Sequence, residues 1–541
     1  MLVSIILISA VVLAVGYRIY GRFLCRRCQI DDSRKTPAHE FEDGVDFVPT
    51  SAPMVFGHHF SSIAGAGPIV GPILATMYFG WGPTWIWILI GAILFGGVHD
   101  FGSMLMSLRN GGRTITEITK TVIGKQTARY FRIFLVLALV YVIIVFLDLT
   151  SSTFAGTPAV ATASGWFIFC AVGLGLVLRW KGLSMPVTLA IFIPLTFAGL
   201  ALGHYLPAEG VPKNAWLAMI LIYCFVASVL PVNTLLQPRD FLSSLFLYAM
   251  MFLGLVGLLF SGQSIEAPFF AGLNTDKANP GFLFPVLFVT VACGACSGFH
   301  SLVASGTTSK QVNRERDAIP LSYGAMLVEG FLAVFALATV AILSTQDLSG
   351  KTAVGIFATG SAVFMSTLGI PQSLGAEFTA LTVSTFLLTT LDTSTRLTRF
   401  LIQEMFEWEG DASRYLGTFL VLLIPGVFAF QTFDGQPAWK VIWPLFGATN
   451  QMMAGLALVT FVVFLKDRSI AFKFALFPAL FMMLSPLTAL VFMAMDSELG
   501  IFLQSISVGM FILGIFVAGM SLKFLLQSHS PVRSPVSSEA N

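Results

Sequence analysis

The chain has 541 residues, of which 56% are hydrophobic and only 11% are charged, and its mean hydropathy is +0.84. A soluble domain carries about 25% charged residues, so this composition excludes a soluble globular protein and predicts an all-α polytopic membrane protein. The net charge of +2 carries no information by itself, because in a membrane protein the positions of the charges matter. No basic run with interleaved aromatic residues is present, so we expect the lipid bilayer, and no nucleic acid, as the partner.

The N-terminal stretch MLVSIILISAVVLAV begins the series of apolar segments. It has no basic residues before the apolar run and no small-residue cleavage motif after it, so we interpret it as a retained first span and not as a signal peptide. A spanning helix needs about 20 mostly apolar residues. About fifteen segments meet this criterion, namely 2–20, 54–79, 82–108, 131–149, 158–178, 185–203, 215–236, 242–261, 282–306, 321–344, 376–398, 416–431, 441–465, 471–495 and 500–524. The apolar stretch 353–368 is shorter and is expected to be re-entrant or interfacial.

The basic residues orient these spans. With the N-terminus outside and the C-terminus inside, the cytoplasmic ends and loops collect nearly all of the 30 Lys and Arg residues, the exceptions being Lys213, Lys277, Lys351 and Lys440. Cytoplasmic loops of membrane proteins carry such an excess of Lys and Arg. The pattern therefore predicts an N-out, C-in topology.

The second span, GHHFSSIAGAGPIVGPILA, is rich in helix-breaking residues. Gly permits non-helical backbone angles and Pro removes a backbone donor, so the helix is expected to unwind near Gly65–Pro68. Unwound backbone inside a bilayer is tolerated where it is buried in protein or lines a wet cavity, and discontinuous helices form the binding sites of transporters. The alternative is a kinked span whose small residues allow close packing.

The seventh span, VASVLPVNTLLQPRD, is interrupted in a similar way by Pro231 and Asn233. Two interrupted helices five spans apart are typical of an inverted repeat of five plus five helices. We therefore divide the chain into a first helix with its cytoplasmic loop, a transporter core, additional helices and a disordered cytoplasmic tail, with bounds 1–53, 54–400, 401–526 and 527–541. Within the core the two repeats are expected at 54–203 and 215–398.

Several ionisable residues lie inside the apolar segments, where a charge costs at least ~2.5 kcal/mol and usually marks function. Asp100 in span 3 and Glu329 in span 10 belong to this class, as do His58 and His300. Asp100, His58 and His300 fall in or near the cytoplasmic half, where a proton relay or an anion site could form.

Two further acids, Glu377 and Asp392, lie near the ends of span 11 and are expected to be solvated. Asp392 also precedes Arg396 by four residues, a spacing that favours a pair on one helix face.

The ninth span contains CGACSGFHSLVASGTTSK. The hydroxyl oxygens of Ser305, Thr307 and Thr308 at its cytoplasmic end could coordinate a small cation. The alternative is that these hydroxyls bond back to their own helix.

Metal and enzyme chemistry find little support. The pairs Cys25–Cys28 and Cys293–Cys296 are interpreted as small buried residues or idle thiols, and no His/Asp pair has the helical spacing of metal ligands. The chain also lacks HExxH, GxSxG and P-loop motifs, so we expect no enzyme, no metal and no cofactor other than a coupling cation.

Several long blocks, in order, resemble the carbon starvation protein CstA family: TPAHEFEDGVDFVPTSAPMVFGHHFSSIAGAGPIVGPILA, LPVNTLLQPRDFLS, CGACSGFHSLVASGTTSK with YGAMLVEGF, FLLTTLDTSTRLTRFLIQE, and WPLFGATNQMMAGLAL. The resemblance implies a multi-pass transporter of the bacterial inner (cytoplasmic) membrane with a leucine-transporter-like fold. It also implies uptake of pyruvate by proton symport, or of peptides, when carbon is scarce. His99 departs from the family pattern, in which Gln is common, and many members are longer, so the substrate can differ.

These observations predict a secondary transporter driven by H+ or Na+ that imports a small carboxylate such as pyruvate, or short peptides; a channel-type permease and a membrane-embedded enzyme are the alternatives. The expected substrate-binding residues are Gly65, Ala66, Gly67, Pro68, His58 and Asn233. The expected ion- or proton-coupling residues are Asp100, His300, Ser305, Thr307 and Thr308. The oligomeric state cannot be inferred from these patterns.

Overall fold

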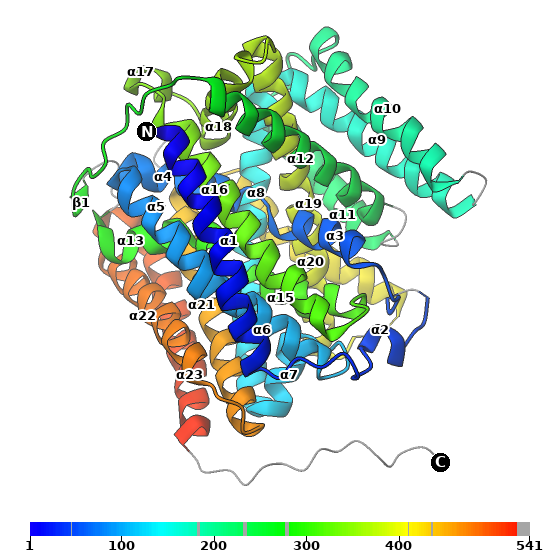
Figure 1. The fold of residues 1–541 in the computed structure, drawn as a ribbon, viewed down its shortest axis with the longest axis vertical. Helices are drawn as coiled ribbons and strands as arrows, with labels where there is room; N and C mark the ends of the chain where they lie inside the picture. The colour runs from blue at the N-terminus through cyan, green and yellow to red at the C-terminus, as the bar shows by residue number, and fades with distance from the viewer. Residues whose placement is uncertain are drawn as a thin grey trace.

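The structure is a computed structural model that describes residues 1–44, 46–180, 184–230, 235–275, 281–408, 410–433 and 436–526, so the predicted tail 527–541 lies outside it. The described chain is almost entirely helical (Figure 1). Its α-helices are α1 (Leu2–Arg27), α2 (Pro37–Glu40), α3 (Ala52–Ile63), α4 (Gly67–Phe79), α5 (Trp81–Ile90), α6 (Gly97–Leu108), α7 (Ile115–Val122), α8 (Lys125–Gly156), α9 (Pro158–Trp180), α10 (Met185–Tyr205), α11 (Lys213–Val229), α12 (Leu236–Phe260), α13 (Leu283–Thr290), α14 (Ala292–Ala295), α15 (Phe299–Gly306), α16 (Ala325–Ala341), α17 (Thr345–Leu348), α18 (Ala353–Ser366), α19 (Gln372–Phe406), α20 (Asp411–Ala429), α21 (Ala438–Asp467), α22 (Lys473–Met495) and α23 (Gly500–Leu526).

Short elements complete the chain. Two π-helical turns, η1 (Gly91–Gly96) and η4 (Ile319–Gly324), precede α6 and α16 without a break. The 3-10 turns are η2 (Thr308–Lys310), η3 (Glu315–Asp317) and η5 (Ser497–Leu499). The strands form two antiparallel hairpins, β1 (Asn274–Thr275) with β2 (Gly281–Phe282), and β3 (Thr432–Phe433) with β4 (Gln436–Pro437).

The predicted spans can be compared with these helices. Among the described residues 12 helices are long and apolar enough to cross a membrane, and the bent pair α3 and α4 raises the number to 13. The other two predicted spans correspond to α11, which has only 17 residues, and to the segment 283–306, which is divided into α13, α14 and α15. The apolar stretch near 353–368 forms α18, a 14-residue helix packed against α4, α12, α16 and α19.

The seventh predicted span requires a correction at its C-terminal end. Helix α11 ends at Val229, and the residues from Leu236 onward begin α12, so the segment LQPRD belongs to the next helix. Pro238 fits there because the first turn of a helix has no intrahelical partner for its N–H groups. Pro231 and Asn233 lie outside the described residues.

The first predicted break is present. Helix α3 ends at Ile63, α4 begins at Gly67, and the two axes differ by 46°. A second break lies in the ninth predicted span, where Cys296 is extended (φ −165°, ψ 110°) between α14 and α15.

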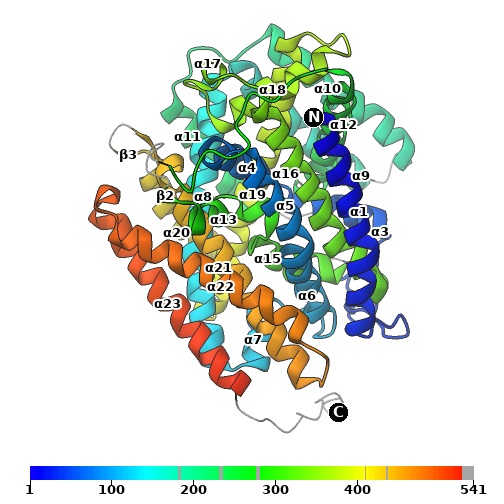
Figure 2. The same ribbon diagram turned by 60° about the vertical axis from the view of Figure 1, so that its left-hand side comes forward.

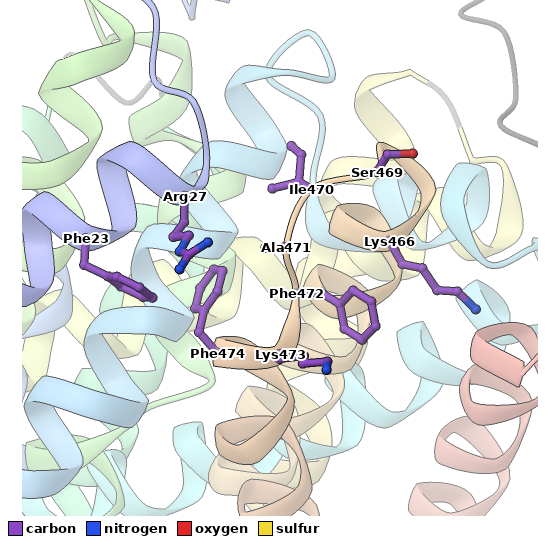
Figure 3. Close-up of a pocket in the computed structure, with 9 residues that line it drawn as sticks. All are labelled: Phe23, Arg27, Lys466, Ser469, Ile470, Ala471, Phe472, Lys473 and Phe474. Carbon is purple, nitrogen blue, oxygen red and sulfur yellow. The ribbon is translucent and has the colours of Figure 1, made fainter.

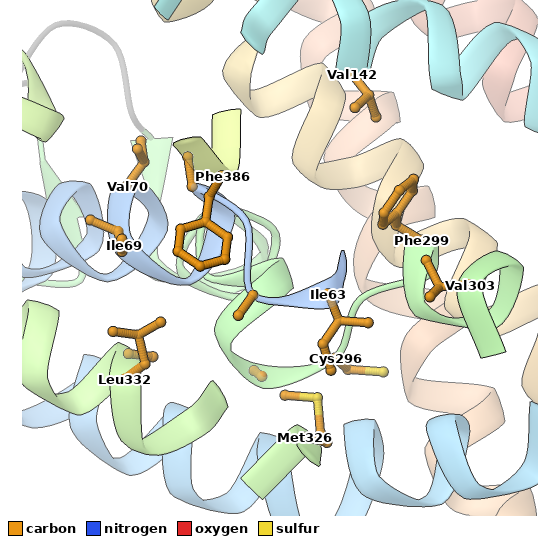
Figure 4. Packing of buried hydrophobic residues seen from close by; sticks show 14 of the residues in the cluster. Ile63, Ile69, Val70, Val142, Cys296, Phe299, Val303, Met326, Leu332 and Phe386 are labelled. Atoms are coloured by element: carbon orange, nitrogen blue, oxygen red, sulfur yellow. The ribbon is translucent and has the colours of Figure 1, made fainter. Parts of the chain in front are cut away.

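The two broken segments pack against each other in the core. Helix α4 lies against α13 and α14, and α3 lies against α15. Figure 4 shows apolar side chains from α3, α4, α15, α16 and α19 filling the space around both breaks, including Ile63, Ile69, Phe299, Met326 and Phe386. The breaks are therefore enclosed by protein, as unwound backbone in a bilayer requires.

The long helices α8 and α19 pack on each other beside the broken segments and form a scaffold. Helices α11 and α20 each pack on both of them and on one another. The α9–α10 hairpin lies at one edge of the molecule (Figure 1), and the α22–α23 pair lies at another (Figure 2).

Burial separates inner from outer spans. In α21, 94% of the residues in its apolar 18-residue stretch are buried, whereas in α1 and in α23 the corresponding share is 28%. The outward residues of α1 and α23 are apolar, as is expected of surfaces that face lipid tails.

Candidate functional site

The first break forms the centre of the candidate site. The predicted substrate-binding residues Gly65, Ala66, Gly67 and Pro68 are all buried here, with Gly65 N–H donating to Ile63 O at 2.8 Å. A Cβ on Gly67 would lie 2.3 Å from Cys293 Sγ, so Gly is the residue that allows α4 to approach α14 this closely. The helices α4 and α14, which flank the two breaks, are thus in direct contact.

The second break is held by one side chain of α21. Asn450 Oδ1 accepts from Phe299 N–H at 3.1 Å and from Ser297 Oγ at 3.3 Å. Its Nδ2 donates to Cys293 Sγ at 3.2 Å, and its backbone carbonyl accepts from Gly298 N–H at 3.1 Å. Asn450 therefore replaces the helical hydrogen bonds that the break removes, as buried backbone groups require.

Next to Asn450, Gln451 fixes the helix that leads into the same segment. Its Nε2 donates to Phe288 O at 2.8 Å, and Ser485 Oγ donates to its Oε1 at 3.2 Å. The block WPLFGATNQMMAGLAL thus supports the second broken segment from α21.

A buried chain of ionisable side chains connects α6, α15 and α16. His300 Nδ1 lies 2.8 Å from Asp100 Oδ2, and His300 Nε2 lies 3.2 Å from Glu329 Oε2. On the other side of Asp100, His99 Nδ1 lies 2.7 Å from Oδ1. All four side chains are at most 1% exposed. The structure therefore brings the predicted residues Asp100 and His300 together and adds Glu329.

Both nitrogens of His300 face carboxylate oxygens, which limits its protonation states. Either the ring is an imidazolium between two carboxylates, or a protonated Glu329 donates to a neutral ring. Interconverting these forms moves one proton between His300 Nε2 and Glu329 Oε2, which lie 3.2 Å apart without an aligned hydrogen bond in this structure. The arrangement can store and pass a proton.

The two π-helical turns lie where the broken segments meet their neighbours. Turn η1 packs on α14, while η4 packs on α3 and α6. Wide turns of this kind are frequent at functional sites. Here they precede the helices that carry Asp100 and Glu329.

The three predicted hydroxyl ligands occupy different positions. Ser305 Oγ donates to Ser301 O at 2.6 Å and accepts from Ile115 N–H at 3.0 Å, so it fixes the start of α7. Thr308 Oγ1 lies 2.8 Å from His59 Nδ1, in a contact between η2 and α3. Thr307 is half-buried at the end of α15 and makes backbone hydrogen bonds to Val303 and Lys310. The hydroxyls of Ser305 and Thr308 thus contact α7 and α3, respectively.

A second buried ionic cluster surrounds Arg239, which is fully buried. Its Nη2 donates to Asp240 Oδ1 at 2.7 Å, and its Nη1 donates to Tyr223 OH at 2.9 Å and to Asp392 Oδ2. Tyr223 OH donates in turn to Asp392 Oδ2 at 2.9 Å. The cluster joins α11, α12 and α19.

Two expectations about span 11 are wrong. Helix α19 extends from Gln372 to Phe406, so Asp392 lies in its interior and is buried, not solvated. Its partner is Arg239 and not Arg396, which instead donates to Ala227 O at 2.8 Å at the end of α11. Glu377, by contrast, lies toward the surface, 3.2 Å from His204 Nδ1.

The predicted ligand His58 belongs to the edge of this cluster. Its Nδ1 lies 3.5 Å from Asp240 Oδ2, and it is partly exposed, whereas the neighbouring His59 is buried. Asn233 lies outside the described residues. Within the described ranges no group of three or more His, Cys, Asp or Glu side chains is arranged to hold a metal ion.

Sequence reasoning did not assign site roles to Asn450, Arg239, Asp240 and Tyr223. The first three lie in blocks that carried the family resemblance, WPLFGATNQMMAGLAL and LPVNTLLQPRDFLS, which was the available signal. Tyr223 lies in an ordinary apolar helix, and its contact with Asp392 is visible only in three dimensions.

Comparison with known proteins identifies the family of this arrangement. The family model described as Carbon starvation protein CstA matches residues 1–350 and 344–489. The chain belongs to this family. It is 34% identical over 553 residues to the Peptide transporter CstA of Helicobacter pylori (strain J99 / ATCC 700824), with 88% of this chain and 79% of that protein covered.

Other members of the CstA family carry two different names. The Peptide transporter CstA of Escherichia coli (strain K12) is 32% identical, with 90% of this chain and 80% of that protein covered. The Pyruvate/proton symporter BtsT of the same strain is 29% identical, with 84% and 76% covered.

The fold is also that of solved transporters. A mutant of the Eremococcus coleocola manganese transporter superposes with a TM-score of 0.55 over 87% of this chain and 95% of that one, at 10% identity. The same transporter in complex with an aromatic bis-isothiourea compound gives a TM-score of 0.50 at 11% identity. These neighbours have the leucine-transporter fold, so the chain shares that fold. Its CstA-family relatives are named as transporters, and the described residues contain 12 helices that could cross a membrane.

Proposed function

We propose that the chain imports small carboxylates such as pyruvate, or short peptides, by proton symport across the bacterial inner membrane when carbon is scarce. The names of its CstA-family relatives support the two substrate classes, since relatives are named as peptide transporters and as a pyruvate/proton symporter. The buried Asp100–His300–Glu329 chain supports the proton as the coupling ion.

The net charge of the buried Asp100–His300–Glu329 side chains is the main support for proton coupling. With His300 protonated and His99 neutral, the two carboxylates and the one imidazolium leave one uncompensated negative charge in a site that is at most 1% exposed. A buried charge without a partner is costly, so the cluster gains stability when it takes up one proton. In the proposed cycle the proton enters from outside, neutralises the cluster and leaves on the cytoplasmic side.

The substrate carboxylate is proposed to bind at the first break. At the N-terminal end of α4, Pro68 has no N–H and the Ile69 N–H donates to Ala66 O, so the Gly67 N–H and the positive end of the helix dipole are the features that suit an anion. Cys293 and Thr390 cover Gly67 and Gly65 on their Cβ sides. In this scheme separation of α4 from α14 opens the site, and their closure encloses the substrate.

The contacts support a repeat arrangement that differs from the predicted division at 54–203 and 215–398. In the first repeat we place α3/α4, α5–α6, α8, α11 and α12. In the second we place α13–α15, η4–α16, α19, α20 and α21. Helix α12 in the first repeat then packs on α3 and α18, and its counterpart α21 in the second repeat packs on α13 and α7. In both repeats the helix that follows the broken segment begins with a π turn. The α9–α10 hairpin becomes an insertion.

Uptake into proteoliposomes tests the proposal. Labelled pyruvate is supplied with an imposed proton gradient, a sodium gradient or neither, and a dipeptide is added as competitor. We expect saturable uptake driven by the proton gradient and a loss of at least about tenfold in Asp100→Asn, as expected when a positioned proton-transfer group is removed. Glu377→Gln, which removes a carboxylate near the surface, serves as the matched control and should retain uptake.

The other outcomes discriminate between the alternatives. Dipeptide accumulation without pyruvate uptake would reject the carboxylate substrate while keeping proton coupling. Flux that never saturates would favour a channel-type permease. Uptake driven only by sodium would reject the proton-carrying role of the Asp100–His300–Glu329 chain.

A further inference from the structure

A basic hollow at the C-terminal end of α1 is not explained by the transport site. A pocket of about 620 Å³ lies between α1 and the connection from α21 to α22 (Figure 3). Its lining includes Phe23, Arg27, Lys466, Phe472, Lys473 and Phe474. A second hollow of about 560 Å³ adjoins it along α1 and shares Phe23 and Arg27.

Both hollows are strongly positive. Arg18, Arg22 and Arg26 line the second one and follow each other at intervals of four residues, so they form one stripe on α1. No Asp or Glu lines either hollow, all of whose lining residues are described. Neighbouring cations are instead neutralised, because Arg34 and Arg109 both pair with Glu315. Among the described residues no Asp or Glu side chain is placed in an ion pair with Arg18, Arg22 or Arg26 of this stripe.

Aromatic rings form the main apolar part of the pocket lining. Phe23 and Phe474 meet edge to face with centroids 5.7 Å apart, and the Arg27 guanidinium lies 5.4 Å from the centroid of Phe23. Figure 3 shows Arg27 and Phe474 side by side between α1 and α22. Such rings are common where a surface passes from hydrocarbon to headgroups.

Apolar side chains continue from the hollows along both helices. On α1, Val15 and Ile19 are 47% and 68% exposed, and on α22, Phe477 and Leu480 are 63% and 58% exposed. Both helices have the length and composition of membrane spans, so these side chains face lipid tails. The basic residues thus begin where the lipid-facing surface ends, at headgroup depth.

We propose that the hollow between α1 and the α21–α22 connection binds the phosphate headgroup of an anionic phospholipid. The acyl chains of the lipid then lie along the exposed faces of α1 and α22. Arg27 and Lys473 contact the phosphate, and the arginine stripe on α1 adds long-range attraction. Basic pockets between membrane helices bind anionic headgroups in this way. A free phosphate would use the same cations but would leave the adjoining apolar surface unused.

Binding of fluorescent phosphatidylglycerol to the full chain in detergent micelles tests the proposal, with phosphatidylcholine as the neutral lipid. We expect Arg27→Gln/Lys473→Gln to weaken binding about 30-fold, which corresponds to ~2 kcal/mol for two basic residues. The charge-preserving Arg27→Lys/Lys473→Arg should bind within about threefold of the parent. Arg129→Gln/Lys523→Gln, which removes two exposed basic residues on α8 and α23, should do the same.

Three results would overturn the proposal: equal loss in the Arg129/Lys523 control, unchanged binding in Arg27→Gln/Lys473→Gln, or displacement of the lipid by inorganic phosphate at concentrations similar to those of the lipid. Photo-crosslinking of the unaltered chain with a photoactivatable phosphatidylglycerol gives a test that requires no variant. Labelling of peptides from residues 18–27 or 466–474 supports the site, and labelling confined to other segments rejects it.

Discussion

At the residue scale the protein contains two buried ionic clusters with different chemistry. The Arg239 cluster includes a guanidinium, which stays protonated in proteins, held by Asp240 and Asp392. The Asp100–His300–Glu329 chain has an imidazole at its centre, which changes charge readily. The first is therefore suited to holding α11, α12 and α19 together, and the second to moving a proton.

Removing one acid from the Arg239 cluster should be destabilising. Asp392→Asn leaves the guanidinium with Asp240 alone, and breaking a buried pair costs ~3–5 kcal/mol; we expect the lower end because Asp240 remains. Asp32→Asn, which breaks an exposed pair with Arg316, should cost no more than ~1 kcal/mol. Unfolding curves in the same detergent measure both changes, and equal losses would contradict the assigned role.

Glu329 should be needed for coupling more than for substrate exchange. If Glu329 accepts the proton from His300, then Glu329→Gln keeps this side chain neutral and prevents net proton movement. We expect accumulation driven by a proton gradient to fall at least about tenfold, by the general acid–base argument, while exchange of labelled for unlabelled substrate continues. Proteoliposomes loaded with substrate measure the exchange, and loss of both activities would indicate a structural role instead.

At the element scale, the two broken segments show what could be predicted from sequence. The first break was confirmed because Gly65, Gly67 and Pro68 act locally, through their own backbone preferences. The second lies at Cys296–Gly298, where Asn450, 151 positions from Phe299 in the chain, supplies the missing hydrogen bonds. A partner so distant in the chain cannot be identified from local patterns.

The contact between α4 and α14 beside the two breaks yields a prediction for Gly67. An added Cβ would meet only Cys293, at 2.3 Å from Sγ and 2.5 Å from Cβ, so Gly67→Ala should cost ~1–3 kcal/mol by overpacking and reduce uptake. Cys293→Gly removes both contacting atoms and should restore part of the loss in the double variant. Gly165→Ala on α9, where no atom lies within 4 Å, is the matched control and should leave stability within ~1 kcal/mol. Equal effects at the two glycines would contradict close packing of α4 on α14.

Asn450 gives the corresponding prediction for the second break. Asn450→Ala leaves the buried Phe299 N–H without its acceptor, a loss of ~1–3 kcal/mol. Amide hydrogen exchange at residues 296–300 should accelerate by about tenfold or more, in line with that cost, while exchange in α8 stays unchanged. Uniform acceleration throughout the chain would indicate global destabilisation and not local release of the break.

At the scale of the whole molecule, hydropathy located the 12 membrane-length helices of the described residues and the bent pair α3/α4, because a span is a local property of about 20 residues; it also counted α11 and the segment 283–306 as spans. The pairing of the helices was harder to infer. The hairpin α9–α10 separates α8 from α11, and in the proposed arrangement it is an insertion that changes the repeat spacing a count of spans assumes. The packing of α11 against α20, and of α12 against α3, supports the proposed repeats and is not visible in a count of spans.

The orientation of the protein in the membrane is predicted only from the distribution of its basic residues, and it can be tested on the intact molecule. The N-out, C-in topology places Ser33, in the loop after α1, inside the cell and Ser264, in the loop after α12, outside. Both are exposed, so Ser33→Cys and Ser264→Cys should react with thiol reagents without disturbing the fold. Half-buried Cys25 is replaced by Ser in both variants to lower the background.

An impermeant maleimide should label Ser264→Cys in intact cells and Ser33→Cys only after permeabilisation. The physical reason is that short loops rich in Lys and Arg are retained on the cytoplasmic side. The reverse pattern would invert the molecule and move the basic hollow at α1 to the outer leaflet. It would also require the Asp100–His300–Glu329 chain to receive its proton through the opposite end of the two broken segments.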